Sequence, residues 1–438
     1  MTITTESTSP QMAEGKYFRW LQLVMGIVCM AMIANLQYGW TLFVDPIDAK
    51  FHWGRAAIQL AFTLFVVTET WLVPVEAWFV DKYGPRIVVM FGGVMIALAW
   101  VLNSYADTLV ILYAAAIIGG IGAGAVYGTC VGNALKWFPD RRGLAAGATA
   151  AGFGAGAALT VVPIANMIAA SGYQHAFLTF GIGQGVIVLI LAYFLRKPSR
   201  VMPAKKKQLN LPQTKIDFTP PQVLRAPIFW VMYLVFVMVA SGGLMAAAQI
   251  APIAKDFKIA NEPVGLFGFQ MAALTFAISL DRIFDGFGRP FFGWVSDQIG
   301  REHTMFIAFA TGALMLLTLS VYGNIPVVFV LSTAVYFGVF GEIYSLFPAT
   351  SGDTFGVKYA TTNNGMLYTA KGTASLLVPL ASIVASSYGW QSVFVIAVAL
   401  NATAALLALF VIKPMRRQFI LGNEAAATSG AAQNVKTA

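Results

Sequence analysis

The sequence predicts an all-α membrane protein in which twelve transmembrane helices form two related six-helix bundles. Three observations support this prediction. Of the 438 residues, 58% are apolar and 11% are charged, and the mean hydropathy is +0.72, so the apolar residues exceed what one water-soluble core can bury. Twelve apolar segments have the length of a membrane-spanning helix. A short polar motif recurs in both halves of the chain.

The twelve apolar segments follow one another along the chain and are separated mostly by short loops. Each is longer than the ~10-residue strands of a membrane barrel, and a helix satisfies its own backbone hydrogen bonds in lipid. We therefore expect spanning helices at residues 20–44, 56–80, 87–105, 108–134, 143–170, 175–195, 228–251, 264–295, 303–323, 326–350, 360–387 and 391–412.

A basic stretch between the sixth and seventh segments divides the chain into two groups of six helices. The expected parts are an N-terminal tail at 1–19, a six-helix bundle at 20–195, a linker at 196–227, a second six-helix bundle at 228–412 and a C-terminal tail at 413–438. The chain beyond Gly422 is rich in Ala, Thr, Ser and Gly, so we expect the C-terminal tail to be disordered.

Lysine and arginine are distributed unevenly between the loops. With the N-terminus in the cytoplasm, 21 of the 28 cations fall in tails and loops on the cytoplasmic side and four on the opposite side. The positive-inside rule therefore predicts that both termini are cytoplasmic. Because the net charge of +9 arises in these loops, it indicates membrane topology rather than nucleic-acid binding.

Other features exclude several kinds of site. Cys29 and Cys130 lie in apolar segments, so we expect no disulfide framework and no CxxC metal site. The histidines His52, His175 and His303 are dispersed, and neither an HExxH nor a GxSxG motif is present, which argues against an enzyme. The polar first 19 residues lack the apolar region of a removable signal peptide. We expect no metal and no cofactor.

An internal repeat relates the two halves. Four residues at the end of the second segment recur at the end of the eighth with a constant offset of 216 positions: Pro74, Ala77, Asp81 and Gly84 against Pro290, Gly293, Asp297 and Gly300. The same offset pairs Glu69 with Asp285. Two parallel six-helix repeats around a central site are typical of transporters that work by alternating access.

The repeated segments at residues 77–86 and 293–301 resemble the loop motif of the major facilitator superfamily. In such a motif a small residue lets two helices approach, an Asp meets a helix N-terminus or an Arg, and a Gly closes a tight turn. The residues expected in these gating loops are Asp81, Arg86, Asp297 and Arg301.

Glycines recur at short spacing at residues 119–124 and 152–156. They lack the preceding strand and the following Lys-Ser of a phosphate-binding loop. We expect them to let neighbouring membrane helices pack closely.

Three cations lie within the predicted spans, namely Arg282, Arg289 and Lys371. A charge at the centre of a membrane helix costs roughly 2.5 to 3.5 kcal/mol on insertion scales, so each needs a partner or a function. Arg289 precedes Asp297 by eight residues, which is ~12 Å along a helix and places Arg289 near the midplane. Lys371 reaches a similar depth in the eleventh segment. Two cations at one depth indicate an anion site, in which Arg donates two parallel hydrogen bonds and Lys supplies a compact charge.

Acidic neighbours leave a second, purely structural interpretation open. The possible charge partners are Asp281, Arg282, Asp285 and Glu342. In this interpretation Asp285 neutralises Arg289 four residues later, and Glu342 neutralises Lys371. Arg282 is then occupied by Asp281 or by Glu342.

Polar and aromatic side chains accompany the cations in the predicted spans. They are Gln37, Tyr38, Gln59, Tyr127, Phe153, Phe340, Tyr344 and Tyr368. Aromatic rings exclude water around a small ligand, and hydroxyl and amide groups offer it hydrogen bonds. We predict that these side chains form a substrate site together with Arg289 and Lys371.

Seven stretches from both halves carry a more specific resemblance, at residues 36–47, 56–64, 79–86, 126–147, 284–301, 344–350 and 368–375. They resemble the oxalate/formate antiporter family, a relative of the monocarboxylate transporters within the major facilitator superfamily. The resemblance implies uptake of divalent oxalate in exchange for monovalent formate, and it places the family's basic pair on Arg289 and Lys371. The family's aromatic and glutamine positions fall on Gln37, Tyr38, Gln59, Tyr127 and Tyr344.

The sequence also departs from the family pattern. Phe153 and Phe340 stand where the pattern tends to have Tyr or Trp, and Tyr368 where it tends to have Trp. Asp285 before Arg289 is similar to the Asp/Arg pair of proton-coupled monocarboxylate transporters. A proton-coupled monocarboxylate symporter that uses this pair is therefore the alternative function.

These features predict a secondary active transporter of small carboxylates rather than an enzyme. Two unpaired cations would repel each other in an empty site, so we expect the empty carrier to resist reorientation and exchange to be obligatory. We expect a monomer in the lipid bilayer of the plasma membrane, such as a bacterial inner membrane, with no nucleic-acid partner.

Overall fold

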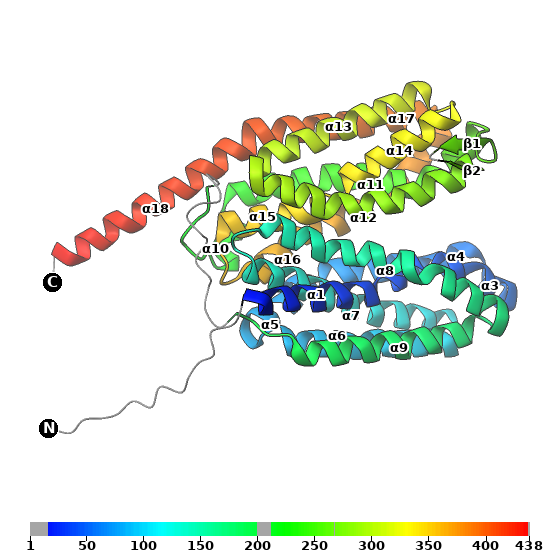
Figure 1. Cartoon of the computed structure of the whole chain (residues 1–438), viewed down its shortest axis with the longest axis horizontal. Helices are drawn as coiled ribbons and strands as arrows, with labels where there is room; N and C mark the ends of the chain where they lie inside the picture. Colours follow the sequence, from blue (N-terminus) through cyan, green and yellow to red (C-terminus); the bar gives the residue numbers. More distant parts are fainter. Residues whose placement is uncertain (1–15, 199–211, 267, 437–438) are drawn as a thin grey trace.

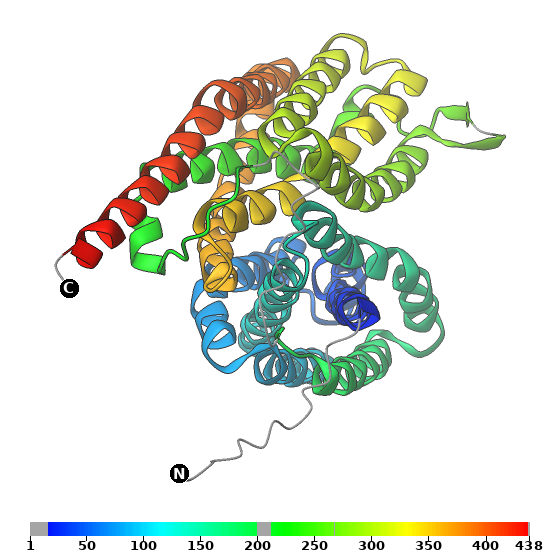
Figure 2. The same ribbon diagram turned by 60° about the vertical axis from the view of Figure 1, so that its left-hand side comes forward.

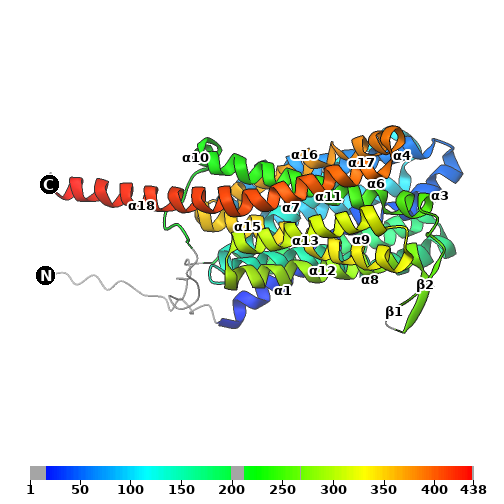
Figure 3. The same ribbon diagram turned by 90° about the horizontal axis from the view of Figure 1, so that it is seen from above.

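The computed structural model describes residues 16–198, 212–266 and 268–436. Two helical bundles lie side by side, one from each half of the chain (Figures 1 and 2). The start of α1 (Lys16–Ile33) and the end of α18 (Lys413–Lys436) lie at the same end of the molecule, which we call the terminal side (Figure 3). The opposite end, which carries a two-stranded hairpin, is called the hairpin side.

The N-terminal bundle begins with two broken spans. The first consists of α1, α2 (Asn35–Tyr38) and α3 (Thr41–Phe51), and the second of α4 (Arg55–Trp71) and α5 (Val73–Tyr83), which bend by 41°. Pro74 at this bend cannot donate a backbone hydrogen bond to the preceding turn. The spans that follow are α6 (Pro85–Tyr105), α7 (Leu109–Trp137), α8 (Arg142–Ser171) and α9 (Tyr173–Phe194).

The C-terminal bundle follows the short helix α10 (Pro220–Arg225). It contains α11 (Pro227–Asp256), α12 (Ala273–Ile299), α13 (Arg301–Tyr322), α14 (Pro326–Phe340), α15 (Ile343–Phe355), α16 (Ala360–Ser375) and α17 (Val378–Leu407). Gly389 breaks α17 with a φ of +78°, a conformation that glycine adopts without a steric cost. A π-helical turn, Ala408–Ile412, joins α17 to α18.

Nine of the described helical stretches are long and apolar enough to cross a membrane, and the bent pair of α4 and α5 makes a tenth. The other two predicted spans correspond to α12 and to α16 with the start of α17, which are more polar. Both α12 and α16 pack against helices of the opposite bundle, so their polar faces are shielded from lipid. With them, the helices fit the twelve predicted spans.

The prediction of a helix from residue 264 is wrong. β1 (Pro263–Leu266) and β2 (Phe269–Ala272) form an antiparallel hairpin there, and α12 begins only at Ala273. Leu266 pairs with Phe269 at the end of the hairpin, and Gly268, directly before Phe269, has a φ of +81°. A tight connection between two strands needs a positive φ, which glycine supplies.

The prediction of a disordered tail at 413–438 is wrong as far as Lys436, because α18 is helical to that residue. Alanine is the best helix former, and a segment that extends an existing helix avoids the cost of nucleation. Residues 437–438 lie outside the described residues, as do residues 1–15 of the predicted tail 1–19 and residues 199–211 of the predicted linker 196–227.

Small residues let helices touch within and between the bundles. A Cβ atom added to Gly147 of α8 would collide with the backbone carbonyl of Arg289 on α12. Added Cβ atoms would likewise meet backbone atoms of a neighbouring helix at Gly120, Gly124, Gly152 and Gly156. The predicted packing role of the closely spaced glycines is confirmed at these positions.

Replacing Gly147 by Leu should destabilise the protein by roughly 1–3 kcal/mol, because α8 and α12 must separate to admit the side chain. The matched control is Gly183→Leu on α9, where an added Cβ meets no atom within 4 Å. Thermal unfolding of the purified protein in detergent measures both variants. Equal stability of the two variants would contradict a close contact at Gly147.

Candidate functional site

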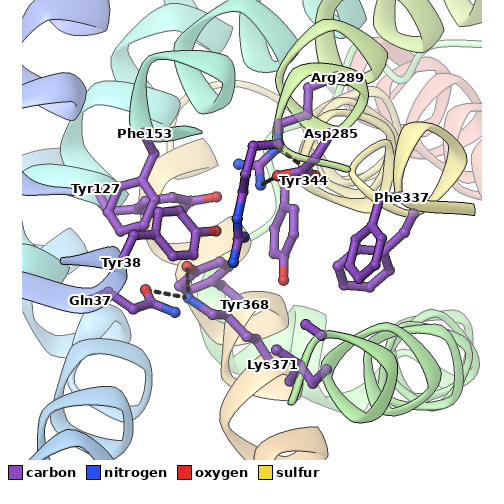
Figure 4. A pocket seen from close by; sticks show the side chains of 14 residues that line it. Gln37, Tyr38, Tyr127, Phe153, Asp285, Arg289, Phe337, Tyr344, Tyr368 and Lys371 are labelled. Carbon is purple, nitrogen blue, oxygen red and sulfur yellow. Dashed lines mark hydrogen bonds and ion pairs between the residues drawn. The ribbon is translucent and has the colours of Figure 1, made fainter. Parts of the chain in front are cut away.

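A small pocket lies between the two bundles and receives side chains from both (Figure 4). Its lining residues are Gln37, Tyr38, Tyr127, Phe153, Leu244, Ala247, Arg282, Asp285, Arg289, Phe337, Phe340, Tyr344, Tyr368 and Lys371. Nine of the ten side chains that the sequence predicts as substrate contacts are among them. Sequence reasoning missed Leu244, Ala247 and Phe337, which are apolar like most residues of their helices.

Arg289 on α12 is neutralised within its own helix. Its Nε and Nη2 atoms donate hydrogen bonds to the two carboxylate oxygens of Asp285 at 3.3 and 2.7 Å, and Nη1 donates to the carbonyl oxygen of Ala150 on α8 at 2.9 Å. The guanidinium carbon also lies 4.8 Å from the ring centroid of Tyr344, within the range of a cation–π contact. Both partners of the ion pair are buried. The predicted pairing of Asp285 with Arg289 is therefore confirmed.

Lys371 on α16 is neutralised by an acid that the sequence did not single out for this role. Its Nζ atom lies 3.1 and 3.3 Å from the two carboxylate oxygens of Glu69 on α4. It also lies 3.0 Å from the hydroxyl of Tyr368 and 3.5 Å from Oε1 of Gln37. The predicted pairing of Lys371 with Glu342 is wrong. Because Glu69 and Lys371 belong to different halves of the chain, their ion pair links the two bundles.

The internal repeat carried the signal for Glu69. The offset that aligns the two loop motifs also pairs Glu69 with Asp285, and each of these acids neutralises one pocket cation. Val73 occupies the position equivalent to Arg289, so Glu69 has no cation one turn later on its own span. Its partner comes from the other bundle, and spacing along one helix cannot reveal such a contact.

Aromatic rings from both bundles surround the two ion pairs. Tyr127 stacks on Tyr368 with ring centroids 4.5 Å apart. Phe153 lies edge-on to Tyr38 and to Tyr127, at 5.2 and 5.8 Å, and Tyr344 lies edge-on to Tyr368 at 6.3 Å. These rings exclude water, and a low local dielectric strengthens the electrostatic contacts of any anion in the pocket.

Arg282 lies at the edge of the pocket, one turn of α12 from Asp285 toward the hairpin side. Its guanidinium carbon is 5.1 Å from the ring centroid of Tyr38 in the opposite bundle. Within the part of the chain that the structure describes, no ion pair at 4.0 Å or less includes Arg282. The predicted occupation of Arg282 by Asp281 or Glu342 is not observed among these residues.

Three residues predicted for the site lie outside the pocket. Gln59 is exposed in the first turns of α4, ten residues before Glu69. That spacing is ~15 Å along a helix, so Gln59 lies nearer the hairpin side than the two ion pairs. Asp281 and Glu342 are buried, yet neither lines the pocket. Neither oxygen of Glu342 has a hydrogen-bond partner among the described residues.

The repeated loop motif of the C-terminal half connects the bundles on the terminal side. Asp297 at the end of α12 accepts hydrogen bonds from the backbone N–H groups of Gly143 and Leu144 at 3.0 and 2.9 Å. These groups form the start of α8, so the carboxylate meets a helix N-terminus, as the motif predicts. Arg301 forms an ion pair with the same carboxylate.

Asp353 on α15 completes this contact. Its carboxylate is fully buried and forms ion pairs with Arg301 of its own bundle and with Arg142 of the opposite bundle. Two charged contacts therefore hold α8 against the C-terminal bundle on the terminal side.

The loop motif of the N-terminal half makes an equivalent contact, with the N-terminus of α16 in the opposite bundle. Asp81 on α5 forms an ion pair with Lys136 and accepts hydrogen bonds from the backbone N–H and the hydroxyl of Thr362 on α16, at 2.9 and 2.6 Å. Arg86 is exposed and lies 3.8 Å from the ring centroid of Tyr193 in its own bundle. Asp81 therefore connects the two bundles on the terminal side. The contact of Arg86 with Tyr193 stays within the N-terminal bundle.

Comparison with known proteins adds independent findings. Residues 23–285 and 243–432 match the family model of the Major Facilitator Superfamily. The oxalate:formate antiporter of Oxalobacter formigenes is 37% identical over 91% of this chain and 93% of that protein. Human monocarboxylate transporter 11 is 27% identical over 64% of this chain and 57% of that protein. The crystal structure of the Escherichia coli fucose:proton symporter has a TM-score of 0.67 at 14% identity and covers 90% of this chain and 99% of that one, a likeness of fold.

Replacing Asp353 by Asn should open the terminal side more often, because Arg142 and Arg301 each lose their ion pair with Asp353. A cysteine at Thr361, a buried α16 residue whose side chain lies against Gly132 of α7, reports the opening. We expect a membrane-permeant thiol reagent to label Thr361→Cys several-fold faster in the Asp353→Asn background. Both native cysteines are buried, which limits background labelling.

The matched control for this experiment is Asp140→Asn. Asp140 forms an ion pair with Arg19 inside the N-terminal bundle at 2.9 Å, so its loss should not accelerate labelling. The same labelling rate in both backgrounds would show that Asp353 does not hold the terminal side closed.

Proposed function

This chain belongs to the Major Facilitator Superfamily, and from that premise we propose that it takes up oxalate in exchange for formate by alternating access. Members of this family with the fold described above are multi-pass membrane transporters rather than enzymes. The substrate and the exchange are the proposed parts. They draw on the 37% identity to the oxalate:formate antiporter of Oxalobacter formigenes.

The observation that carries the proposal is the presence of Arg289 and Lys371 in one buried, aromatic-lined pocket. The planar fork of Arg289 can donate two parallel hydrogen bonds to one carboxylate, and Lys371 can offset a second charge. Tyr127 and Tyr368, which line the same pocket, add hydroxyl groups within it. An anion with two carboxylates uses both cations, whereas formate can use only one.

The charge pairs change the argument for obligatory exchange. Arg289 and Lys371 do not repel each other as unpaired cations, because Asp285 and Glu69 neutralise them in the empty pocket. The predicted repulsion is therefore absent from this structure. The proposed exchange is supported by the antiporter relative and not by that repulsion.

The proposal includes a membrane orientation. We place the terminal side in the cytoplasm, since the basic loops gather there and the positive-inside rule applies to such loops. In this orientation the hairpin of β1 and β2 faces the outside of the cell. The proposal also includes that the protein acts as a monomer in the plasma membrane, such as a bacterial inner membrane.

The alternative is a proton-coupled monocarboxylate symporter that uses Asp285 and Arg289. The specific observation in its favour is the two-point hydrogen bonding between them, at 2.7 and 3.3 Å. A substrate that takes Arg289 must displace Asp285, and a proton on Asp285 would remove the charge left behind.

Counterflow in proteoliposomes tests the proposed exchange. Vesicles that contain the purified protein and internal formate or oxalate should take up external oxalate, whereas vesicles without internal substrate should not. Equal uptake into loaded and empty vesicles would refute exchange. Arg289→Lys should reduce counterflow by about tenfold or more, because Lys cannot reproduce the two parallel hydrogen bonds. The control Arg417→Lys changes an exposed residue on α18 and should keep full counterflow.

A pH gradient tests the alternative. If the protein is a symporter, an inward proton gradient should drive accumulation of formate or lactate into vesicles that contain no substrate. Asp285→Asn should then abolish the accumulation, because Asn cannot bind the transported proton. Uptake that ignores the gradient would exclude symport.

A further inference from the structure

Two buried acids each neutralise one pocket cation, Asp285 from the pocket wall and Glu69 from behind it. Asp285 binds Arg289, and Glu69 binds Lys371. The two acids occupy equivalent positions of the internal repeat, although one cation comes from the same helix and the other from the opposite bundle. Two of the three cations that line the pocket are therefore neutralised by an acid, and Arg282 lies at the pocket edge.

A substrate carboxylate would compete with Asp285 for Arg289 and with Glu69 for Lys371. Glu69 has no exposed surface, and Asp285 is 5% exposed. If a substrate carboxylate took Lys371 while Glu69 kept its charge, an unpaired carboxylate would remain away from water at a large cost in free energy. The same holds for Asp285 when a substrate takes Arg289. A proton on the displaced acid removes this cost.

The surroundings of Glu69 offer no second cation. The titratable side chains near Glu69 are Lys371 and Tyr368 of α16, Tyr127 of α7 and Glu76 of α5. α2 contributes the neutral Gln37. α3 carries Asp45, Asp48 and Lys50. Asp48 accepts a hydrogen bond at 2.8 Å from the backbone N–H of Gly54 in the loop before α4, and Lys50 lies in the last turn of α3. Lys371 is the one cation among the side chains named near Glu69, so its capture by substrate leaves Glu69 uncompensated.

The surroundings of Asp285 are similar. The titratable side chains near it are Arg289, Asp281 and Arg282 of α12 and Tyr344 of α15. Arg282 is directed at the ring of Tyr38. The charged residues of α8, α11 and α13 lie near the ends of those helices, away from the pocket.

The ion pair between Glu69 and Lys371 also crosses from one bundle to the other. Any movement that separates α4 from α16 must break it. Each charge then needs a new partner, which is substrate for Lys371 and a proton for Glu69. Loading of the pocket and movement of the bundles are thus connected through the same pair.

We propose that Glu69 and Asp285 each bind one proton when a substrate carboxylate replaces them at their cation, so that the exchange is electroneutral. This inference rests on the proposed exchange of oxalate for formate. A dianion engages both cations and enters with two protons from the same aqueous side. A monoanion engages one cation and leaves with one proton. One cycle therefore moves no net charge and carries one net proton inward with oxalate.

The test measures the equilibrium distribution of oxalate between formate-loaded proteoliposomes and medium. A potassium gradient with valinomycin imposes about 59 mV, the potential that shifts the equilibrium of a one-charge process about tenfold. We expect no shift with this potential and about a tenfold shift for a gradient of one pH unit. A tenfold shift with potential and none with pH would overturn the inference and leave the proposed exchange standing. Absence of counterflow would overturn both.

Variants test the assignment to these two acids. Glu69→Gln with Asp285→Asn removes both proton sites, and exchange in this double variant should become potential-dependent by about tenfold per 59 mV. Glu342→Gln is the control, because Glu342 is an equally buried acid that contacts no pocket cation, and exchange should stay independent of potential. A double variant that exchanges without potential dependence contradicts the assignment. The measurement on the unmodified protein decides the inference if the double variant does not fold.

Discussion

The need to neutralise charge at membrane depth organises this molecule. A charged side chain in a membrane helix is tolerated only where it faces the interior and meets a partner. The charged face of α12 therefore turns toward the opposite bundle, and the polar helix α16 does the same. The pocket lies where Asp285 with Arg289 and Glu69 with Lys371 come together. The same residues that exclude these two helices from lipid thus create the place where an anion can bind.

Charge also holds the terminal side together, through the acid of each copy of the repeated motif. Asp297 meets the N-terminus of α8, and Asp81 meets the N-terminus of α16 through Thr362. Both acids occupy equivalent positions of the repeat, and each also pairs with one cation, Arg301 or Lys136. One kind of residue therefore serves two functions, since acids near the ends of spans hold the bundles together and acids within the spans neutralise the pocket cations.

The aromatic wall explains one departure from the family pattern. Tyr368 stands where that pattern tends to have Trp, and its hydroxyl lies 3.0 Å from Nζ of Lys371 and 3.4 Å from Glu69. An indole has no acceptor oxygen at this position. Tyr368 and Glu69 therefore belong to one polar group around Lys371, which keeps this cation paired when the pocket holds no substrate. Phe153 adds an apolar ring 5.9 Å from the same Nζ atom.

The sequence by itself determined the membrane class, the two related halves, the two pocket cations and most of the pocket wall, because hydropathy, repeat spacing and rare intramembrane charges are local features of a chain. It also offered Asp285 as a possible partner of Arg289, since the two are one turn apart, and the structure confirms this pair. Only the tertiary structure decided that Glu69 rather than Glu342 neutralises Lys371 and that Gln59 lies outside the pocket. The first depends on the contact of α4 with α16 across the bundles, and the second on where α4 begins relative to its bend. Such contacts arise from the packing of distant segments, which no spacing along a single helix encodes.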